Sequence, residues 1–294
     1  MPLEPIGKLM ESARQGGYAL GYFESWSLDS LQGVIDAAEK VSAPVIIGFN
    51  GDFLCHSGRK ASERLAWYAA LGRAAAASAS IPCGFIFNEC PNDDWVRQAA
   101  ELGFNLVMPA DPDASYDDYE RRVRDITEHA HRLGAAVEAE IGTLPCGVGE
   151  HAQPSIQTDP ELAARFVAAT NVDLLGVSVG NVHIRLEGAA ELDLDQLERI
   201  WRRVSIPLVL HGGTGIAPAS LKASIKLGVR KVNYGTYIKQ RYLAVVSEVL
   251  GRGVRNPHEM LGLGGANDLM VAGRLAVRDA VLDRIDLLGC CGQA

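Results

Sequence analysis

Two apolar segments near the end of the sequence are each followed by residues that can bind a metal ion or an anion. These residues are His211, Gly212, Gly213 and Thr214 after segment 206–210, and Asn233, Tyr234, Gly235 and Thr236 after a segment that ends at 232. Short apolar runs are typical of buried parallel strands, and a glycine-rich turn before a helix exposes backbone N–H groups to an anion. An imidazole beside such turns indicates a divalent metal next to a phosphorylated carbonyl substrate. The alternative is that His211 is an ordinary loop residue in a common strand-to-helix turn.

The rest of the sequence alternates between short apolar segments and amphipathic segments. We expect strands at 18–23, 44–50, 84–88, 106–110, 136–141, 174–180, 207–211 and 230–233. We expect helices between them at 30–40, 61–77, 92–102, 116–133, 160–170, 194–204 and 217–227. Eight such repeats predict an α/β fold, a (β/α)8 TIM barrel, and the residues after Thr236 predict extra C-terminal helices. The length of 294 residues suits a single domain that spans 1–294.

In a barrel of this kind the active site lies at the carboxyl ends of the strands. The polar residues that we expect there are Glu24, Asn50, Asn88, Glu89, Glu138, Glu140, His183, His211, Asn233 and Thr236. Of the seven histidines, only His183 and His211 fall at strand ends. Two neutral imidazoles and one carboxylate form a common shell for a catalytic metal ion, with positions left for water or substrate.

The composition favours a cytoplasmic enzyme that acts on a small molecule. Hydrophobic residues make up 48% of the chain, which is enough for a large core, but no apolar run is long enough to cross a membrane. The first residues lack the basic and apolar stretches of a signal peptide. A net charge of −8 argues against a nucleic-acid surface, and the six cysteines lack zinc-finger spacing. We therefore expect no nucleic-acid or membrane partner.

Several motifs occur in an order that is known from one enzyme family. Segments 177–183, 207–216 and 231–236 resemble those of the class II, metal-dependent fructose-bisphosphate and tagatose-bisphosphate aldolases. The resemblance begins at 18–23, includes 137–142 and continues to 288–292, so it covers the whole chain. It implies a zinc ion held by three histidines, a site for dihydroxyacetone phosphate, and an aspartate that moves a proton during cleavage of the carbon–carbon bond. It also implies a homo-oligomer, either a dimer or a tetramer.

The resemblance assigns roles to particular residues. His183 and His211 match two of the metal ligands of the family. The residues that match the segments holding the ketose phosphate are Gly212, Gly213 and Thr214, together with Asn233, Tyr234, Gly235 and Thr236. Ile184 stands where the family has a glycine after the metal histidine. Its N–H group can still bind the phosphate, although its side chain would crowd a closely bound anion.

The third predicted strand departs from the family at the metal site. The family has an Asp-His pair at the end of this strand, whereas this chain has Asn88 and Glu89. Because a carboxylate can replace the missing imidazole, we expect Glu89, His183 and His211 to hold one divalent metal ion. Zinc follows from the resemblance. A carboxylate ligand shifts the preference toward harder metals, so manganese, iron and cobalt are alternatives.

The same departure affects proton transfer. Asn88 stands at the position of the catalytic aspartate of the family, and an amide cannot titrate. Glu24 stands where the family usually has an asparagine. We therefore expect Glu24, Glu140 or a metal-bound water to carry the acid–base step.

These observations predict a metal-dependent lyase of the aldolase type. It would make or cleave a carbon–carbon bond of a phosphorylated ketose or a related carbonyl compound through a metal-stabilised enediolate. Two alternatives remain open. One is a metal-dependent isomerase or hydrolase that uses the same site, because a fold alone does not determine the chemistry. The other is a barrel that binds a ligand without catalysis.

Overall fold

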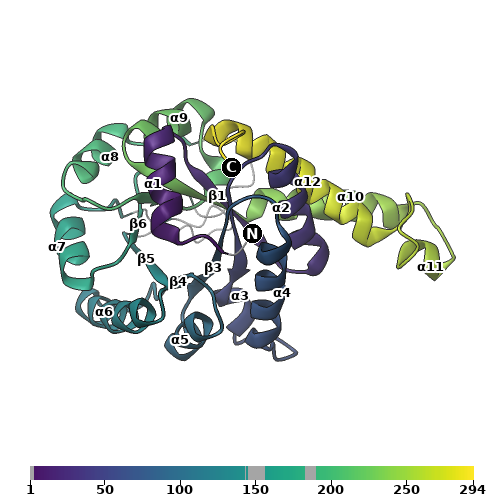
Figure 1. Ribbon diagram of the computed structural model, residues 1–294, viewed down its shortest axis with the longest axis horizontal. Helices are drawn as coiled ribbons and strands as arrows, with labels where there is room; N and C mark the ends of the chain where they lie inside the picture. Colours follow the sequence, from purple (N-terminus) through teal and green to yellow (C-terminus); the bar gives the residue numbers. More distant parts are fainter. Residues whose placement is uncertain (1–2, 143, 145–155, 183–189) are drawn as a thin grey trace.

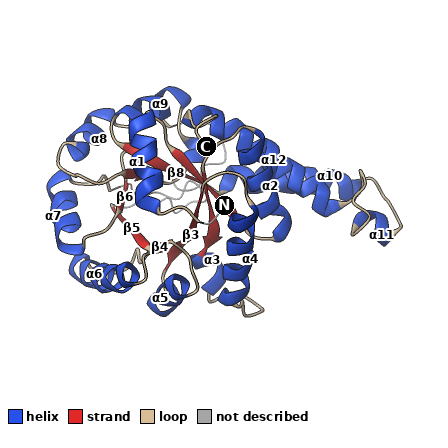
Figure 2. Cartoon of the chain, viewed as in Figure 1, coloured by secondary structure: helices blue, strands red, loops and turns tan. Residues whose placement is uncertain are grey.

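A closed barrel of parallel strands forms the centre of the protein, with helices around it (Figure 1; Figure 2). The computed structural model describes residues 3–142, 144, 156–182 and 190–294. The strands follow one another around the barrel in chain order. They are β1 (Leu20–Ser25), β2 (Val45–Asn50), β3 (Cys83–Cys90), β4 (Leu106–Pro109), β5 (Ala136–Ile141), β6 (Leu174–Val177), β7 (Leu208–Leu210) and β8 (Val229–Tyr234).

The helices form an outer ring and an extension. They are α1 (Ile6–Gly16), α2 (Leu28–Lys40), α3 (Gly51–Cys55), α4 (Leu65–Ser78), α5 (Asp93–Glu101), α6 (Tyr116–Arg132), α7 (Pro160–Thr170), α8 (Leu194–Trp201), α9 (Pro218–Lys226), α10 (Thr236–Gly251), α11 (Pro257–Met260) and α12 (Leu269–Leu288). A short 3₁₀ helix, η1 (Gly213–Gly215), follows β7. None of the described helices is long and apolar enough to cross a membrane.

The strands form because their apolar side chains can be buried on both faces. Every residue of β1, β2, β4, β6 and β7 is buried, as in a sheet that helices cover on one side and that closes on itself on the other. Helices begin where a side chain can cap them: Asn92, Ser115 and Asp159 accept hydrogen bonds from the first turns of α5, α6 and α7. The predicted TIM barrel with C-terminal helices is therefore confirmed.

The amino-terminal segment was not predicted as structured, yet it closes one end of the barrel. In Figure 1, α1 lies across the barrel. Glu4 N donates a hydrogen bond of 2.9 Å to Cys83 O at the start of β3, and Ile6 and Leu9 are each only 3% exposed. Because α1 covers the amino ends of the strands, the carboxyl ends form the open mouth of the barrel.

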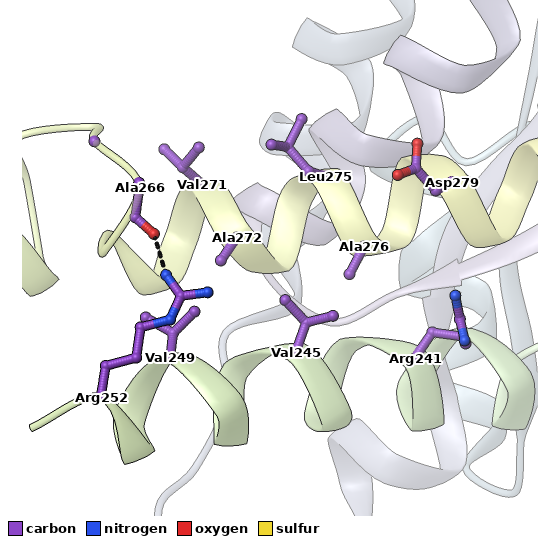
Figure 3. A pocket seen from close by; sticks show the side chains of 11 residues that line it. Arg241, Val245, Val249, Arg252, Ala266, Val271, Ala272, Leu275, Ala276 and Asp279 are labelled. Atoms are coloured by element: carbon purple, nitrogen blue, oxygen red, sulfur yellow. Dashed lines mark hydrogen bonds between the residues drawn. The ribbon is translucent and has the colours of Figure 1, made fainter.

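The helices after β8 form an arm that extends away from the barrel. Helices α10 and α12 run side by side, and α11 lies at the tip (Figure 1). Helix α12 packs against α2, and Arg274 Nη2 of α12 lies 2.7 Å from Asp36 Oδ1 of α2. A cavity of about 280 Å³ lies between α10 and α12. Figure 3 shows Val245, Val249 and Leu275 on its walls. This cavity lies in the arm and not at the mouth of the barrel.

Candidate active site

Three charged side chains from different strands meet inside the barrel. Glu138 belongs to β5, Lys231 belongs to β8, and His211 follows β7 directly. His211 Nε2 lies 2.9 Å from Glu138 Oε1, and Lys231 Nζ lies 2.7 Å from Glu138 Oε2. The three side chains are at most 1% exposed. Buried charges are costly unless they are paired, so this cluster depends on the closed barrel that brings its members together.

The surrounding carboxylates determine the charge of the His211 ring. Burial by itself would lower the pKa of the imidazole, but Glu140, Glu138 and Glu89 raise this pKa to about 10. Burial also opposes ionisation of Glu138, yet Lys231 and His211 lower the pKa of its carboxyl group. The carboxylates around the ring therefore favour its protonated form.

An irregularity at the end of β3 directs Glu89 toward His211. Glu89 has a φ of 51°, in the left-handed region, and the register of β3 with β4 shifts between Phe87 and Cys90. Its Oε1 lies 2.8 Å from His211 Nδ1, and its Oε2 accepts a hydrogen bond of 2.8 Å from Asn50 Nδ2. A left-handed non-glycine residue at a strand end is rare, and such conformations concentrate at functional sites.

The two glutamates predicted for proton transfer lie in different places. Glu140 Oε2 lies 3.2 Å from His211 Nδ1, so Glu140 and Glu89 face the same ring nitrogen. Glu24 instead pairs with Lys239 of α10. Its Oε2 approaches the turn between β8 and α10 so closely that a Cβ atom added to Gly235 would lie 2.7 Å away. The structure thus places Glu140 beside His211 and Glu24 beside a predicted anion-binding turn.

Asn88, predicted to replace the catalytic aspartate, is buried next to Asn50. The two residues are partners in the register of β2 and β3, and Asn88 is 2% exposed. Within the described part of the chain, its Oδ1 atom has no hydrogen-bond partner. A buried amide oxygen without a partner costs free energy, and a bound ligand can supply the missing donor.

The two predicted anion-binding turns are close-packed. Gly212 has a φ of 67°, and a Cβ atom added to Gly213 would lie 2.6 Å from Val232 Cγ1. Gly213 is therefore required for packing against β8. Thr214 Oγ1 accepts a hydrogen bond of 3.2 Å from Tyr237 N, which joins the turn after β7 to the first turn of α10.

In the second turn, Tyr234 belongs to the hydrophobic core, whereas Asn233 contacts the buried charged residues. The ring of Tyr234 is fully buried and stacks on Phe23 with 5.5 Å between ring centroids, so this side chain belongs to the core. Asn233 Oδ1 accepts a hydrogen bond of 2.6 Å from Lys231 Nζ, which links the turn to the buried charges. Thr236 is the first residue of α10.

The predicted metal site is only partly within the described residues. His183 and the neighbouring Ile184 lie outside them. Within the described residues, no group of three or more His, Cys, Asp or Glu side chains is arranged to hold a metal ion. The groups around His211 are nevertheless suited to binding a metal ion. Its Nε2 atom contacts a carboxylate and its Nδ1 atom faces Glu89 and Glu140, and metal-binding histidines usually have a carboxylate on the second ring nitrogen.

Comparison with known proteins identifies the family. The model of the class-II fructose-bisphosphate aldolases matches residues 4–293. The chain belongs to this family. The fructose-bisphosphate aldolase of Thermus caldophilus is 30% identical over 319 residues, with 98% of each chain covered. The YdjI protein of Escherichia coli K12 is 32% identical over 282 residues, with 94% of each chain covered. The crystal structure of the YdjI aldolase has a TM-score of 0.81 to this chain at 29% identity, and it covers 100% of both chains.

Family membership makes the protein an aldolase-like lyase and confirms the resemblance seen in the sequence. The family is generally dependent on a divalent metal ion and acts on sugar phosphates. Glu89, Glu140 and His211 of the aldolase lie at or just after the carboxyl ends of their strands, where TIM-barrel enzymes have their active sites. Glu138 and Lys231 lie deeper in the barrel, in the middle of β5 and β8.

One residue of the cluster was missed by the sequence interpretation, and another was left without a role. Lys231 was not predicted as part of the site, and Glu138 was only one of several polar residues at strand ends. The available signal was a lysine within the apolar strand β8, two residues before Asn233. Residues i and i+2 of a strand face the same side, so Lys231 had to lie on the face that carries Asn233.

A second cavity of the aldolase reaches the buried cluster at His211. It has a volume of about 620 Å³, and Glu89, Glu140 and His211 form part of its wall. The rest of the wall comes from Asp52 of α3, from residues in or after β3, β4 and β5, from α6, and from residues between 156 and 162, before and in the first turn of α7. Its size is that of a small-molecule site, for which volumes of roughly 300–1,000 Å³ are common.

Proposed function

We propose that this aldolase makes or cleaves a carbon–carbon bond of a phosphorylated ketose with one divalent ion held by His211, Glu89 and His183. The orientation of His211 supports the proposal most strongly. Its Nε2 atom contacts the buried carboxylate of Glu138, while its Nδ1 atom faces the carboxylates of Glu89 and Glu140. A divalent ion bound there would act as a Lewis acid on the carbonyl group of the substrate. Zinc is the expected metal, and manganese, iron or cobalt would suit the carboxylate ligand.

The phosphate end of the substrate is assigned to the turns after β7 and β8. Gly212, Gly213 and Thr214 belong to the first turn, and Asn233, Tyr234, Gly235 and Thr236 to the second, with Ile184 as a further contact from the family pattern. The hydrogen bond from Tyr237 N to Thr214 Oγ1 holds the two turns together. Because α10 begins at Thr236, its positive end lies at the second turn and favours an anion.

Proton transfer is assigned first to Glu140. Its carboxylate is 19% exposed and lines the large cavity, so it can reach a bound substrate. Asn88 cannot exchange a proton, but its buried amide oxygen can accept a hydrogen bond from a substrate hydroxyl. Glu24 is the second candidate for the relay, and its pairing with Lys239 at the far turn supports a role at the phosphate end instead.

Metal analysis tests the proposed site. Protein purified without added metal should contain about one divalent ion per chain, and His211→Ala should lose it because a ligand is removed. His258→Ala is the matched control, because His258 lies in α11 at the tip of the arm. A His211→Ala protein with the metal content of the control would exclude His211 as a ligand.

Product analysis tests the reaction. Incubation with dihydroxyacetone phosphate and a set of aldehydes, followed by NMR, should reveal new carbon–carbon bonds. Rearranged or hydrolysed sugar phosphates would favour the isomerase or hydrolase alternative. Tight binding of dihydroxyacetone phosphate to metal-free protein, without turnover when metal is restored, would favour a non-catalytic binding barrel.

We also propose that the arm contributes to a homo-oligomer, a dimer or a tetramer. Leu261 and Leu263 at its tip are 58% and 68% exposed, and Leu243 of α10 is 63% exposed. Exposed leucines concentrated on one extension are typical of protein–protein contacts. Light scattering of the protein and of the Leu261→Lys, Leu263→Lys double variant measures the effect, and an unchanged molar mass would exclude this tip from the contact.

A further inference from the structure

The large cavity and the proposed phosphate turns lie on opposite sides of His211. The strands follow chain order around the closed barrel, so β8 is opposite β4. The proposed phosphate turns follow β7 and β8, whereas apart from Asp52 and His211 the cavity is lined by residues from β3 onward through the start of α7. A ketose phosphate anchored at the turns would therefore place the carbon–carbon bond near His211 and extend its other half into the cavity.

The wall of this cavity is mainly apolar. Met108 and Ile141, which are nearly buried, line it together with Leu162 and Ile156. Ile156 is 61% exposed, so a large apolar side chain is presented to whatever enters. Burial of apolar ligand surface against such side chains is favourable by about 25 cal/mol per Å², and a charged group there would lose its hydration without a partner.

Apart from His211, the charged side chains among the described residues of this wall are acidic. Asp52, Asp111 and Asp159 line the cavity in addition to the two glutamates near His211, and none of the described residues that line it is a lysine or an arginine. Carboxylates of this number repel a phosphate group. The wall thus disfavours a second phosphate both through its apolar side chains and through its charge.

Arg122, a cation that adjoins this wall through Asp111, is neutralised. Arg122 of α6 pairs with Asp111, and it also donates to Asp93, with Nε 3.0 Å from Oδ2 and Nη2 2.7 Å from Oδ1. Asp111 therefore stands between the cavity and the guanidinium. Two carboxylates on one guanidinium leave no positive charge to attract an anion.

We infer that the aldehyde half of the substrate is an uncharged, largely apolar aldehyde and not a phosphorylated one. This inference rests on the proposed function and names the substrate class for the same site. In the condensation, the donor carbon loses a proton and forms a bond to the aldehyde carbon, and the aldehyde oxygen gains a proton. Cleavage is the reverse, so no other reactant is consumed.

Three aldehydes test the inference with dihydroxyacetone phosphate as the donor. Glyceraldehyde and glyceraldehyde 3-phosphate differ only in the phosphate, and butanal lacks the hydroxyl groups as well. We expect kcat/KM to be at least about tenfold lower for glyceraldehyde 3-phosphate than for glyceraldehyde, and butanal to be at least as good a substrate as glyceraldehyde. A preference for the phosphorylated aldehyde would overturn the inference while leaving the aldolase activity intact. Absence of any condensation product with all three would instead count against the proposed function.

A matched pair of variants locates the selectivity. Asp111→Asn removes the carboxylate between Arg122 and the cavity, while Asp93 still holds the guanidinium. Its kcat/KM for glyceraldehyde 3-phosphate should rise relative to glyceraldehyde by a factor on the order of ten. Asp113→Asn is the control, because it makes the same change in charge in the same loop at a residue that does not line the cavity. Equal ratios in both variants would overturn the role of this wall.

A second substitution tests the same wall independently, in case the Asp111→Asn protein does not fold. Ile156→Asp places another carboxylate on an exposed part of the wall, where folding should tolerate it. The kcat/KM for butanal should fall several-fold, whereas Ile156→Val should retain it. Unchanged kcat/KM for butanal in Ile156→Asp would show that the aldehyde does not occupy this cavity.

Discussion

The mouth of the barrel and the helical arm are stabilised in opposite ways. At the mouth, Glu138 and His211 are in contact although 73 positions separate them in the sequence, and both are fully buried. In the arm, Asp268 accepts hydrogen bonds from four backbone N–H groups that lie within six positions of it. Buried charges at the mouth depend on closure of the whole barrel, whereas the start of α12 depends on local contacts. Substitutions in the two regions should therefore differ in how much they change the stability and in how far the change extends through the protein.

The largest effect is expected from breaking the buried cluster. Glu138→Leu leaves His211 and Lys231 buried without their shared partner, which should lower the free energy of unfolding by about 3–5 kcal/mol. Urea unfolding measures this loss. The double variant Glu138→Leu, Lys231→Met also removes the ammonium group that has lost its carboxylate partner, and it should recover part of the stability. A double variant less stable than Glu138→Leu would show that the cluster is not a paired network.

The next largest effect concerns the rate and not the stability. Glu140→Gln should lower kcat by a factor of about 10²–10⁴ and should remove one ionisation from the pH profile of kcat, because the proton relay is lost. Glu24→Gln should mainly raise KM for dihydroxyacetone phosphate, since Glu24 lies at the phosphate turn. If Glu140→Gln keeps the full rate and pH profile, the relay belongs to Glu24 or to a metal-bound water.

A smaller and local effect is expected in the arm. Asp268→Ala removes the cap of α12 and should cost about 1–2 kcal/mol. Hydrogen exchange should rise in the first turns of α12 and in 262–268, while kcat/KM stays unchanged. Asp279→Ala, an exposed position further along α12, is the control. Faster exchange at the mouth of the barrel would contradict the separation of the two regions.

The pH dependence of this cap follows from the pKa of Asp268. Hydrogen bonds from Gly262 N and Gly264 N lower the pKa of this carboxyl group below its ordinary value of 3.8. A carboxyl group with a lowered pKa in the folded state stabilises the protein above its unfolded pKa and loses this contribution as the pH falls through its folded pKa. The difference in α12 exchange between the protein and Asp268→Asn should therefore be constant from pH 7 to about 5 and shrink below about 4. A difference that grows in acid would contradict this assignment.

The sequence alone was sufficient for the barrel, because the information is local. Apolar runs and caps indicate strands and helices within a few residues, as for 136–141 and 160–170, which coincide with β5 and α7. Eight such repeats leave few alternatives to a closed barrel, and the strand ends then indicate where His211, Glu89 and Glu140 must lie. The family pattern added the class of reaction.

Only the tertiary structure decided which of these residues touch. The left-handed backbone at Glu89 aims its carboxylate at His211, and no local pattern in the sequence signals that conformation. Closure of the barrel places Glu140 beside Nδ1 of His211, and it places Glu24 beside Lys239. The pairing of Lys231 with Glu138 and the apolar cavity beyond Glu140 also arise from side chains far apart in the sequence. Strand ends are encoded by neighbouring residues, whereas distances between side chains depend on how the whole barrel closes.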